Sequence, residues 1–389
     1  MSMLTTPEYL TPQWQCLTTQ PDTLGESPFW NPRESRLYWV DIPGQRLRRM
    51  TVTPDLSAKQ VVEDWPLNEE PGCFAPAEKG GWVMALRSGI YRAHVWGGAL
   101  TLLVPAPYDT SKLRFNDGKC DPEGNFWAGS MYEPRDQAAG VLYALQSHQQ
   151  LQVKATQATV ANGLAWSPDG NTLYWSDTAS HSIRAWNFDG QTQALSGERV
   201  FAQFPMKPKT WAYGTAEAKM YAGRPDGAAV DAEGFYYAAM YEGHRLAKFA
   251  PDGRCVAFIE TPVQCPTMPC FGGEDLRTLF VTSDGTTDQC RHMWYTSIPA
   301  RRAALIAGWR QFLADLDVYV HEEQAPVVVA SPIMDLPAVN VNIEGALQVL
   351  SNLPEFGGRL RAFIDGLNPA PESDQDFADA ENEVKVLKR

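Results

Sequence analysis

A chain of 389 residues, 44% hydrophobic and 20% charged, has the composition of a folded globular protein, which excludes wholesale disorder. Its 33 basic and 46 acidic residues give a formal charge of −13, so nucleic acid and anionic membrane surfaces are not expected partners. No stretch reaches the roughly 18 apolar residues of a membrane span, and the first ten residues carry no secretory signal pattern. Seven cysteines without a Cys-x-x-Cys pair indicate reduced thiols. We therefore expect a cytoplasmic protein.

Six stretches of the chain repeat one pattern: a polar residue, a short apolar strand, a Pro/Asp/Gly turn and an aromatic-rich strand. Turns such as Ser167-Pro-Asp-Gly170 suit a tight strand reversal, and further strand-like runs such as 182–188 follow. Four strands in about 45 residues are typical of one propeller blade. The sequence therefore predicts an all-β, six-bladed β-propeller; a β-sandwich followed by other domains would explain the strands but not their recurring phase. The repeats begin at Glu26, Gly72, Asn116, Asn162, Asp226 and Thr267, with steps of 46, 44, 46, 64 and 41 residues.

The longest step contains an insertion around residues 204–224. Long excursions leave a propeller at the ends of its blades. We expect this insertion either to roof one mouth of the central channel or to form a surface loop without function. The ring itself should close through residues 292–298 and an N-terminal strand such as 14–18.

The repeat pattern ends near Ile298, and the remainder of the chain follows a different one. Residues 369–389 hold six acidic and three basic residues, so we expect this tail to be disordered. We predict a propeller domain over 1–299 and a short, partly helical C-terminal extension over 300–389, either an appendage or an oligomerisation element. Apolar residues lie at helical spacing at Leu305, Trp309, Phe312, Leu313 and Leu316.

Oxygen-bearing side chains stand at the start of four repeats, namely Glu26, Asn116, Asn162 and Asp226. The first strand of each blade lies along the propeller axis, so we expect these side chains to converge there. Two carboxylates with amide oxygens suit a hard divalent cation such as Ca²⁺, Mg²⁺ or Mn²⁺. A single Asn-Gly or Asp-Gly is typical of a turn, and it is their recurrence at one blade phase that favours a site.

The strings Leu24-Gly-Glu-Ser-Pro28, Arg114-Phe-Asn-Asp-Gly-Lys119, Asn162-Gly-Leu-Ala-Trp-Ser-Pro-Asp-Gly170 and Arg224-Pro-Asp-Gly227 resemble the senescence-marker-protein/gluconolactonase/luciferin-regenerating-enzyme family. The resemblance extends over residues 20–298 and implies a six-bladed, metal-dependent lactone hydrolase. The insertion and the segment after 298 depart from the family pattern.

The resemblance also implies roles for individual residues. It makes Glu26, Asn162 and Asp226 the ligands of one divalent metal ion (Ca²⁺, Zn²⁺, Mg²⁺ or Mn²⁺) and places Arg114 and Asn116 where they hold substrate oxygens. The metal would polarise the carbonyl of a sugar lactone, of the gluconolactone, arabinolactone or xylonolactone type, and activate a water molecule. Asp226, as both ligand and general base, would take the proton of that water.

Glu133, which follows the second strand of the third repeat, is a further candidate for contacting the substrate. We expect His181 at the surface and consider His244 a candidate for the mouth of the pocket. No Gly-x-Ser-x-Gly motif or metal-like histidine pair occurs.

Two other functions stay open. The first is hydrolysis of phosphoesters or organophosphates on the same propeller metal site, and the second is a non-catalytic, ligand-binding propeller. We expect a small-molecule sugar lactone as partner, and a monomer or weak homo-oligomer.

Overall fold

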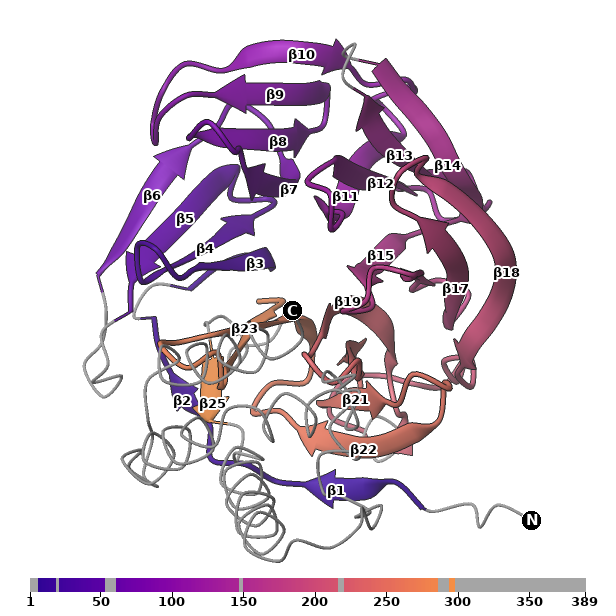
Figure 1. Ribbon diagram of the computed structural model, residues 1–389. Coiled ribbons are helices and arrows are strands. Elements are labelled where there is room, and N and C mark those ends of the chain that lie inside the picture. Colours follow the sequence, from indigo (N-terminus) through magenta and orange to yellow (C-terminus); the bar gives the residue numbers. More distant parts are fainter. Residues whose placement is uncertain are drawn as a thin grey trace, which may run out of the picture. The chain divides into compact units, whose positions relative to one another are not determined.

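The computed structural model describes residues 6–18, 21–52, 61–146, 150–215, 220–285 and 294–297. Strands in this part of the chain form six sheets, of which five have four strands and one has five. The sheets are arranged around a common centre (Figure 1), which confirms the predicted all-β propeller. The chain divides into two compact units, Met1–Gly273 with Thr278–Ser297 and Glu274–Arg277 with Ile298–Arg389, and the sheets belong to the first.

Each sheet is built mainly from strands that are consecutive in sequence, so each repeat folds largely on itself. The sheets are numbered here by the chain order of their innermost strands. Sheet 1 contains β3(Gly25–Asn31), β4(Arg36–Asp41), β5(Arg46–Thr51) and β6(Val62–Pro66); sheet 2, β7(Pro71–Pro76), β8(Trp82–Leu86), β9(Gly89–Ala93) and β10(Thr101–Pro105); sheet 3, β11(Leu113–Cys120), β12(Phe126–Tyr132), β13(Gly140–Gln146) and β14(Gln150–Ala158); sheet 4, β15(Ala161–Trp166), β16(Thr172–Asp177), β17(Ser182–Asp189) and β18(Ala194–Gln203); sheet 5, β19(Arg224–Val230), β20(Tyr236–Tyr241), β21(Arg245–Phe249), β22(Cys255–Glu260) and β1(Glu8–Leu10); and sheet 6, β23(Pro266–Gly272), β24(Thr278–Ser283), β25(Trp294–Ser297) and β2(Gln15–Cys16).

The innermost strands β3, β7, β11, β15, β19 and β23 face the centre of the ring, and β6, β10, β14 and β18 lie at its periphery (Figure 1). Within the consecutive strands all pairings are antiparallel, whereas β1 adds to the outer edge of β22 in parallel. Hydrogen bonds join the starts of neighbouring innermost strands, for example from Ser27 to the Gly72 carbonyl and from Thr267 to the Gly25 carbonyl, so these starts lie at the same end of the axis.

The hydrophobic core lies between neighbouring sheets. One cluster joins Tyr38 of sheet 1 to Phe74 and Trp82 of sheet 2. Another joins Trp30 of sheet 1 to Phe280 of sheet 6, whose rings stack with centroids 5.9 Å apart. Burial of large aromatic side chains is the dominant favourable term in such interfaces. The sheets are thus held to one another by apolar contacts.

Sheet 6 combines strands from both ends of the described chain. Its outer strand β2 pairs antiparallel with β25, where Gln15 opposes Tyr295 and Cys16 opposes Trp294. The predicted closure of the ring by an N-terminal strand is therefore confirmed. Hydrogen bonds between sheets 6 and 1 support it, because Thr267 Oγ1 donates to the carbonyl of Gly25 at 2.6 Å.

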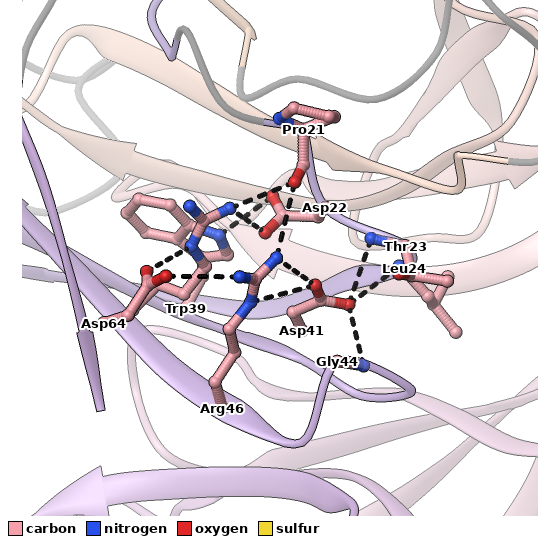
Figure 2. A network of polar contacts seen from close by, with 10 residues as sticks. Pro21, Asp22, Thr23, Leu24, Trp39, Asp41, Gly44, Arg46 and Asp64 are labelled. Atoms are coloured by element: carbon pink, nitrogen blue, oxygen red, sulfur yellow. Dashed lines mark hydrogen bonds and ion pairs between the residues drawn. The ribbon is translucent and has the colours of Figure 1, made fainter. Parts of the chain in front are cut away.

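A network of ion pairs strengthens sheet 1 beside this closure. Figure 2 shows Asp22, Asp41 and Asp64 gathered around guanidinium groups. Arg48 is completely buried and donates to Asp22 and Asp64, while Trp39 Nε1 donates to Asp22 at 3.0 Å. Burial raises the pKa of Asp22 to about 6, against the lowering effect of Arg48. The network orders the chain that leads into β3.

The predicted helices and acidic tail of residues 300–389 lie outside the described residues, so the partly helical extension and its boundary stay a prediction. In the part of the chain that is described, no helix is long and apolar enough to cross a membrane. The six cysteines in that part are free thiols.

Candidate active site

Every innermost strand carries an irregularity in its pairing near its start. A β-bulge inserts residues that have no partner and turns neighbouring side chains away from the regular alternation. Four of the six bulges lie at or beside the residues predicted to face the axis. The six fall between Glu26 and Phe29, Pro71 and Cys73, Phe115 and Gly118, Asn162 and Ala165, Pro225 and Ala228, and Pro266 and Pro269.

Backbone conformation at two bulges depends on small side chains. Ser27 and Gly163, which directly follow Glu26 and Asn162, have φ values of 49° and 57°. Gly163 also lies against Tyr236, whose hydroxyl donates to the Gly163 carbonyl at 2.8 Å. A side chain on Gly163 would collide with that hydroxyl and with Ser176. The backbone at the start of β3 and of β15, beside Glu26 and Asn162, therefore has a defined conformation.

The four side chains expected at the axis are all buried there: Glu26, Asn116, Asn162 and Asp226 are 7%, 6%, 1% and 6% exposed. Asn116 Nδ2 donates to Asn162 Oδ1 at 2.9 Å, and Asn162 Nδ2 donates to Asp226 Oδ1. Repulsion from Asp226 acts on Glu26, which places the two carboxylates within electrostatic reach of each other. The structure therefore brings these four residues together from sheets 1, 3, 4 and 5.

A directional chain of hydrogen bonds leads from Arg114 to Asp226. Arg114 Nη1 donates to Asn116 Oδ1 at 2.7 Å. Since a guanidinium can only donate, Asn116 must present its oxygen to Arg114 and its nitrogen to Asn162. Asn162 is then oriented in the same way, with its nitrogen toward Asp226 and Thr178 Oγ1. Arg114 thus decides how both amides point.

Burial and like charge act in the same direction on the two carboxyl groups. Burial raises the pKa of Glu26 well above its usual value, and repulsion from Asp226 and Asp117 adds to this. Burial also raises the pKa of Asp226, against the attraction of Arg224. Keeping two buried carboxylates ionised while they repel each other costs free energy unless a positive charge lies nearby. The site is therefore suited to hold a cation.

The donor set fits a hard divalent cation. Glu26 and Asp226 offer carboxylate oxygens, and the Asn162 oxygen, which accepts from Asn116, retains a second lone pair. Among the described residues no three His, Cys, Asp or Glu side chains form a metal-binding group. A cation at this site would therefore need water or substrate oxygens to complete its coordination.

Glu133 is placed at the edge of the site but in an ion-pair network. Both of its oxygens accept from Arg87, at 2.9 and 3.0 Å, and Arg87 also pairs with Glu70. Arg114 Nε lies 3.7 Å from Glu133. The structure thus assigns Glu133 a visible contact with Arg114 and Arg87, and its contact with substrate stays a prediction.

The insertion is docked on the loops of sheets 4, 5 and 6. Lys207 Nζ donates to Glu242 at 2.7 Å, and the Tyr213 hydroxyl lies 3.5 Å from Cys265 Sγ. Tyr221 contacts His181 Nε2 at 2.6 Å. These contacts hold the insertion at the end of the axis where the predicted site residues lie.

His181 is not at the surface as expected, since only 2% of it is exposed. The sequence places it in a hairpin, where exposure is normal, but the insertion covers it: besides Tyr221, the backbone N–H of Lys207 donates to Nε2 at 3.2 Å. His244 lies in the turn between β20 and β21 and is exposed.

Several residues near the site were not identified from the sequence. Asp117 accepts from the backbone N–H of Leu164 at 2.9 Å and thereby supports the bulge of β15. Thr178 bridges Asn162 and the carbonyl of Pro225. Asp117 stands inside the Asn-Asp-Gly string and could have been recognised there, whereas no local pattern distinguishes Thr178.

Comparisons with a family model and with characterised proteins relate this chain to the same family, and a solved structure shares its fold. Residues 24–285 match the family model "SMP-30/Gluconolactonase/LRE-like region". The chain is 40% identical over 269 residues to a 6-deoxy-6-sulfogluconolactonase of Pseudomonas putida, covering 69% of this chain and 86% of that protein. It is 31% identical over 273 residues to regucalcin of Danio rerio, covering 69% and 85%. A solved regucalcin of Agrobacterium tumefaciens, described as calcium-binding, shares the fold with a TM-score of 0.65 at 24% identity, covering 75% of this chain and 96% of that one.

Proposed function

The chain belongs to the SMP-30/gluconolactonase/LRE-like family, and we propose that it hydrolyses the cyclic ester of a sugar lactone with the help of one divalent cation. Relatives named for lactone hydrolysis support the reaction class, and the relative from Pseudomonas putida makes a 6-substituted gluconolactone a first substrate to test beside gluconolactone itself. The observation that carries the proposal is the buried axial group of Glu26, Asn162 and Asp226, with Arg114 and Asn116 beside it.

In the proposed reaction, water adds across the ester bond of the ring. The water oxygen bonds to the carbonyl carbon, the bond from that carbon to the ring oxygen breaks, and a proton reaches the ring oxygen, which leaves an open hydroxy acid. A divalent cation supplies polarisation of the carbonyl when bound. Glu26, Asn162 and Asp226 would hold it.

Asp226 is suited to accept the proton from the attacking water. Burial raises the pKa of Asp226, and a bound divalent cation would lower it again, which would keep the carboxylate ionised and able to accept a proton. The Asn162 amide donates to the same carboxylate and fixes which oxygen remains available. Asp226 would later return the proton to the ring oxygen.

Arg114 and Asn116 are suited to bind and orient the substrate. The Arg114 guanidinium is buried, 9% exposed, and donates through Nη1 to both the Phe115 carbonyl and Asn116. Its remaining N–H groups can donate to lactone oxygens or to the oxyanion that develops on the carbonyl. The ion pair of Glu133 with Arg87 would hold the outer side of this guanidinium in place.

The proposal is tested by metal analysis of the purified protein and by lactone hydrolysis, followed as acid release, before and after chelation. A panel of aldonolactones is measured beside a paraoxon-type phosphotriester. We expect one divalent ion per chain and loss of lactone hydrolysis on chelation, restored by adding the ion back. Faster hydrolysis of the phosphotriester than of every lactone would contradict the substrate class.

Two substitutions at Asp226 separate its two proposed roles. Asp226→Asn keeps an oxygen that can accept from Asn162 but removes the basicity, so we expect kcat to fall by about 10²–10⁴ while metal content is retained. Asp226→Ala removes the ligand as well and should lose metal and turnover together. Near-normal kcat in Asp226→Asn would show that another group takes the proton.

A further inference from the structure

The insertion brings two cations to a single carboxylate. Lys207 Nζ lies 2.7 Å from Glu242 Oε1, and Arg224 Nη2 lies 3.3 Å from Glu242 Oε2. Within the described part of the chain neither cation has another carboxylate at ion-pairing distance. Two cations therefore share one ion-pairing carboxylate here, in a protein whose formal charge is −13.

The cations face solvent, whereas their partner does not. The side chain of Glu242 is 5% exposed, and those of Lys207 and Arg224 are 29% and 19% exposed. Both cations also make cation–π contacts with aromatic rings. The Lys207 ammonium lies 3.8 Å from the centre of the Trp211 ring, and the Arg224 guanidinium lies 5.2 Å from that of Tyr241. Their positions are thus set before any ligand arrives.

This group of residues borders the axial site. Arg224 is two residues before Asp226 on β19, and its charge acts directly on that carboxylate. Thr178 links the same strand to Asn162 through the Pro225 carbonyl. Arg224 thus links the Lys207–Glu242 ion pair to the carboxylate at the axis.

We propose that Lys207 and Arg224 form a subsite for a negatively charged substituent of the lactone, such as a sulfonate or carboxylate at the end of the sugar chain. This deepens the proposed function and rests on it. An ammonium and a guanidinium make charge-assisted hydrogen bonds to such oxygens, and an incoming anion would give the two cations that share Glu242 a second negatively charged partner. A lactone without a negative charge would form no charge-assisted hydrogen bond with Lys207 or Arg224.

The test compares gluconolactone with lactones that carry a sulfonate or a carboxylate at carbon 6. The wild-type protein should have a higher kcat/KM for the anionic lactones, and salt should reduce this preference because it screens partly exposed charges. In Lys207→Met, the ratio of kcat/KM for anionic over neutral lactone should fall by about tenfold or more, chiefly through KM. Lys207→Arg keeps the charge and should retain most of the preference. Which anionic lactone reacts faster distinguishes the sulfonate from the carboxylate.

Lys209→Met is the matched control. It removes the same charge from an exposed position of the insertion two residues away, and it should leave the ratio unchanged. A wild-type protein that hydrolyses neutral and anionic lactones equally well would overturn the subsite but leave the lactonase function intact, as would an equal loss in both lysine variants. If no lactone is hydrolysed, the proposed function fails and the subsite fails with it.

Discussion

Burial determines the protonation of His181. Its Nδ1 lies 3.2 Å from the Ala179 carbonyl, which can only accept, so Nδ1 carries the hydrogen. Nε2 is then the acceptor for the Tyr221 hydroxyl and the Lys207 N–H. Burial lowers the pKa of His181 below its usual 6.5, against the effect of the Ala179 hydrogen bond. Protonation would turn Nε2 into a donor, which abolishes the hydrogen bond from the Lys207 N–H and reverses the one with the Tyr221 hydroxyl.

His181 should therefore contribute stability that is lost in acid. As pH falls through 6.5, the unfolded chain binds the proton first, so the folded state loses its advantage. We expect His181→Gln, which cannot titrate, to be less stable than the wild type at pH 7.5 and to approach it at pH 5.5. Urea denaturation at both pH values measures this difference. His94→Gln, at an exposed position, is the control, and a difference independent of pH would contradict the assignment.

At the scale of the strand, the bulge of β15 shapes the site through Gly163. Two obstacles oppose any larger residue there: the positive φ of 57° and the close approach of Ser176 and Tyr236. The second obstacle is specific to the axis, because Gly170, in a surface turn with a φ of 71°, has only Pro122 nearby at 3.5 Å.

Comparison of Gly163→Ala with Gly170→Ala should isolate the effect of close approach. Both variants bear the left-handed backbone strain, of about 1–2 kcal/mol. Gly163→Ala should lose about 1–3 kcal/mol more through overpacking, and it should also reduce lactone turnover because Asn162 shifts. Thermal unfolding and kcat measure the two effects. Equal stability and activity of the two variants would show that the bulge tolerates displacement.

At the scale of the whole ring, the seam between sheets 6 and 1 joins distant parts of the chain. Leu17, 1% exposed, follows β2 directly and packs with Trp30, Trp39 and Phe280 from the two sheets. Within sheet 6, β2 pairs with β25 through Gln15 and Cys16 in the described part of the chain. Leu17 thus adds the apolar side chain of the N-terminal segment to a seam that also contains the Trp30–Phe280 stack.

We expect Leu17→Ala to lower the free energy of unfolding by about 2–5 kcal/mol, the cost of a cavity in a packed core. Denaturant unfolding gives this value, and the same titration on Leu10→Ala provides the control, because Leu10 is 38% exposed in β1. Comparable losses in both variants would show that the seam contributes no more than an ordinary edge strand.

The sequence by itself determined the all-β propeller and the residues at its axis. Repeats such as 162–177 encode a strand, a turn and a second strand within a few residues, so local rules suffice to predict them. Glu26, Asn116, Asn162 and Asp226 occupy one phase of these repeats, and the symmetry of the ring then brings them together.

Only the tertiary structure decided how these residues point and what covers them. The orientation of the Asn162 amide depends on Arg114 through Asn116, and the burial of His181 depends on Tyr221, 40 residues later in the chain. The pairing of Lys207 with Glu242 likewise joins the insertion to another sheet. No local pattern encodes such contacts, because hydrogen bonds and burial between distant segments exist only after the sheets have packed.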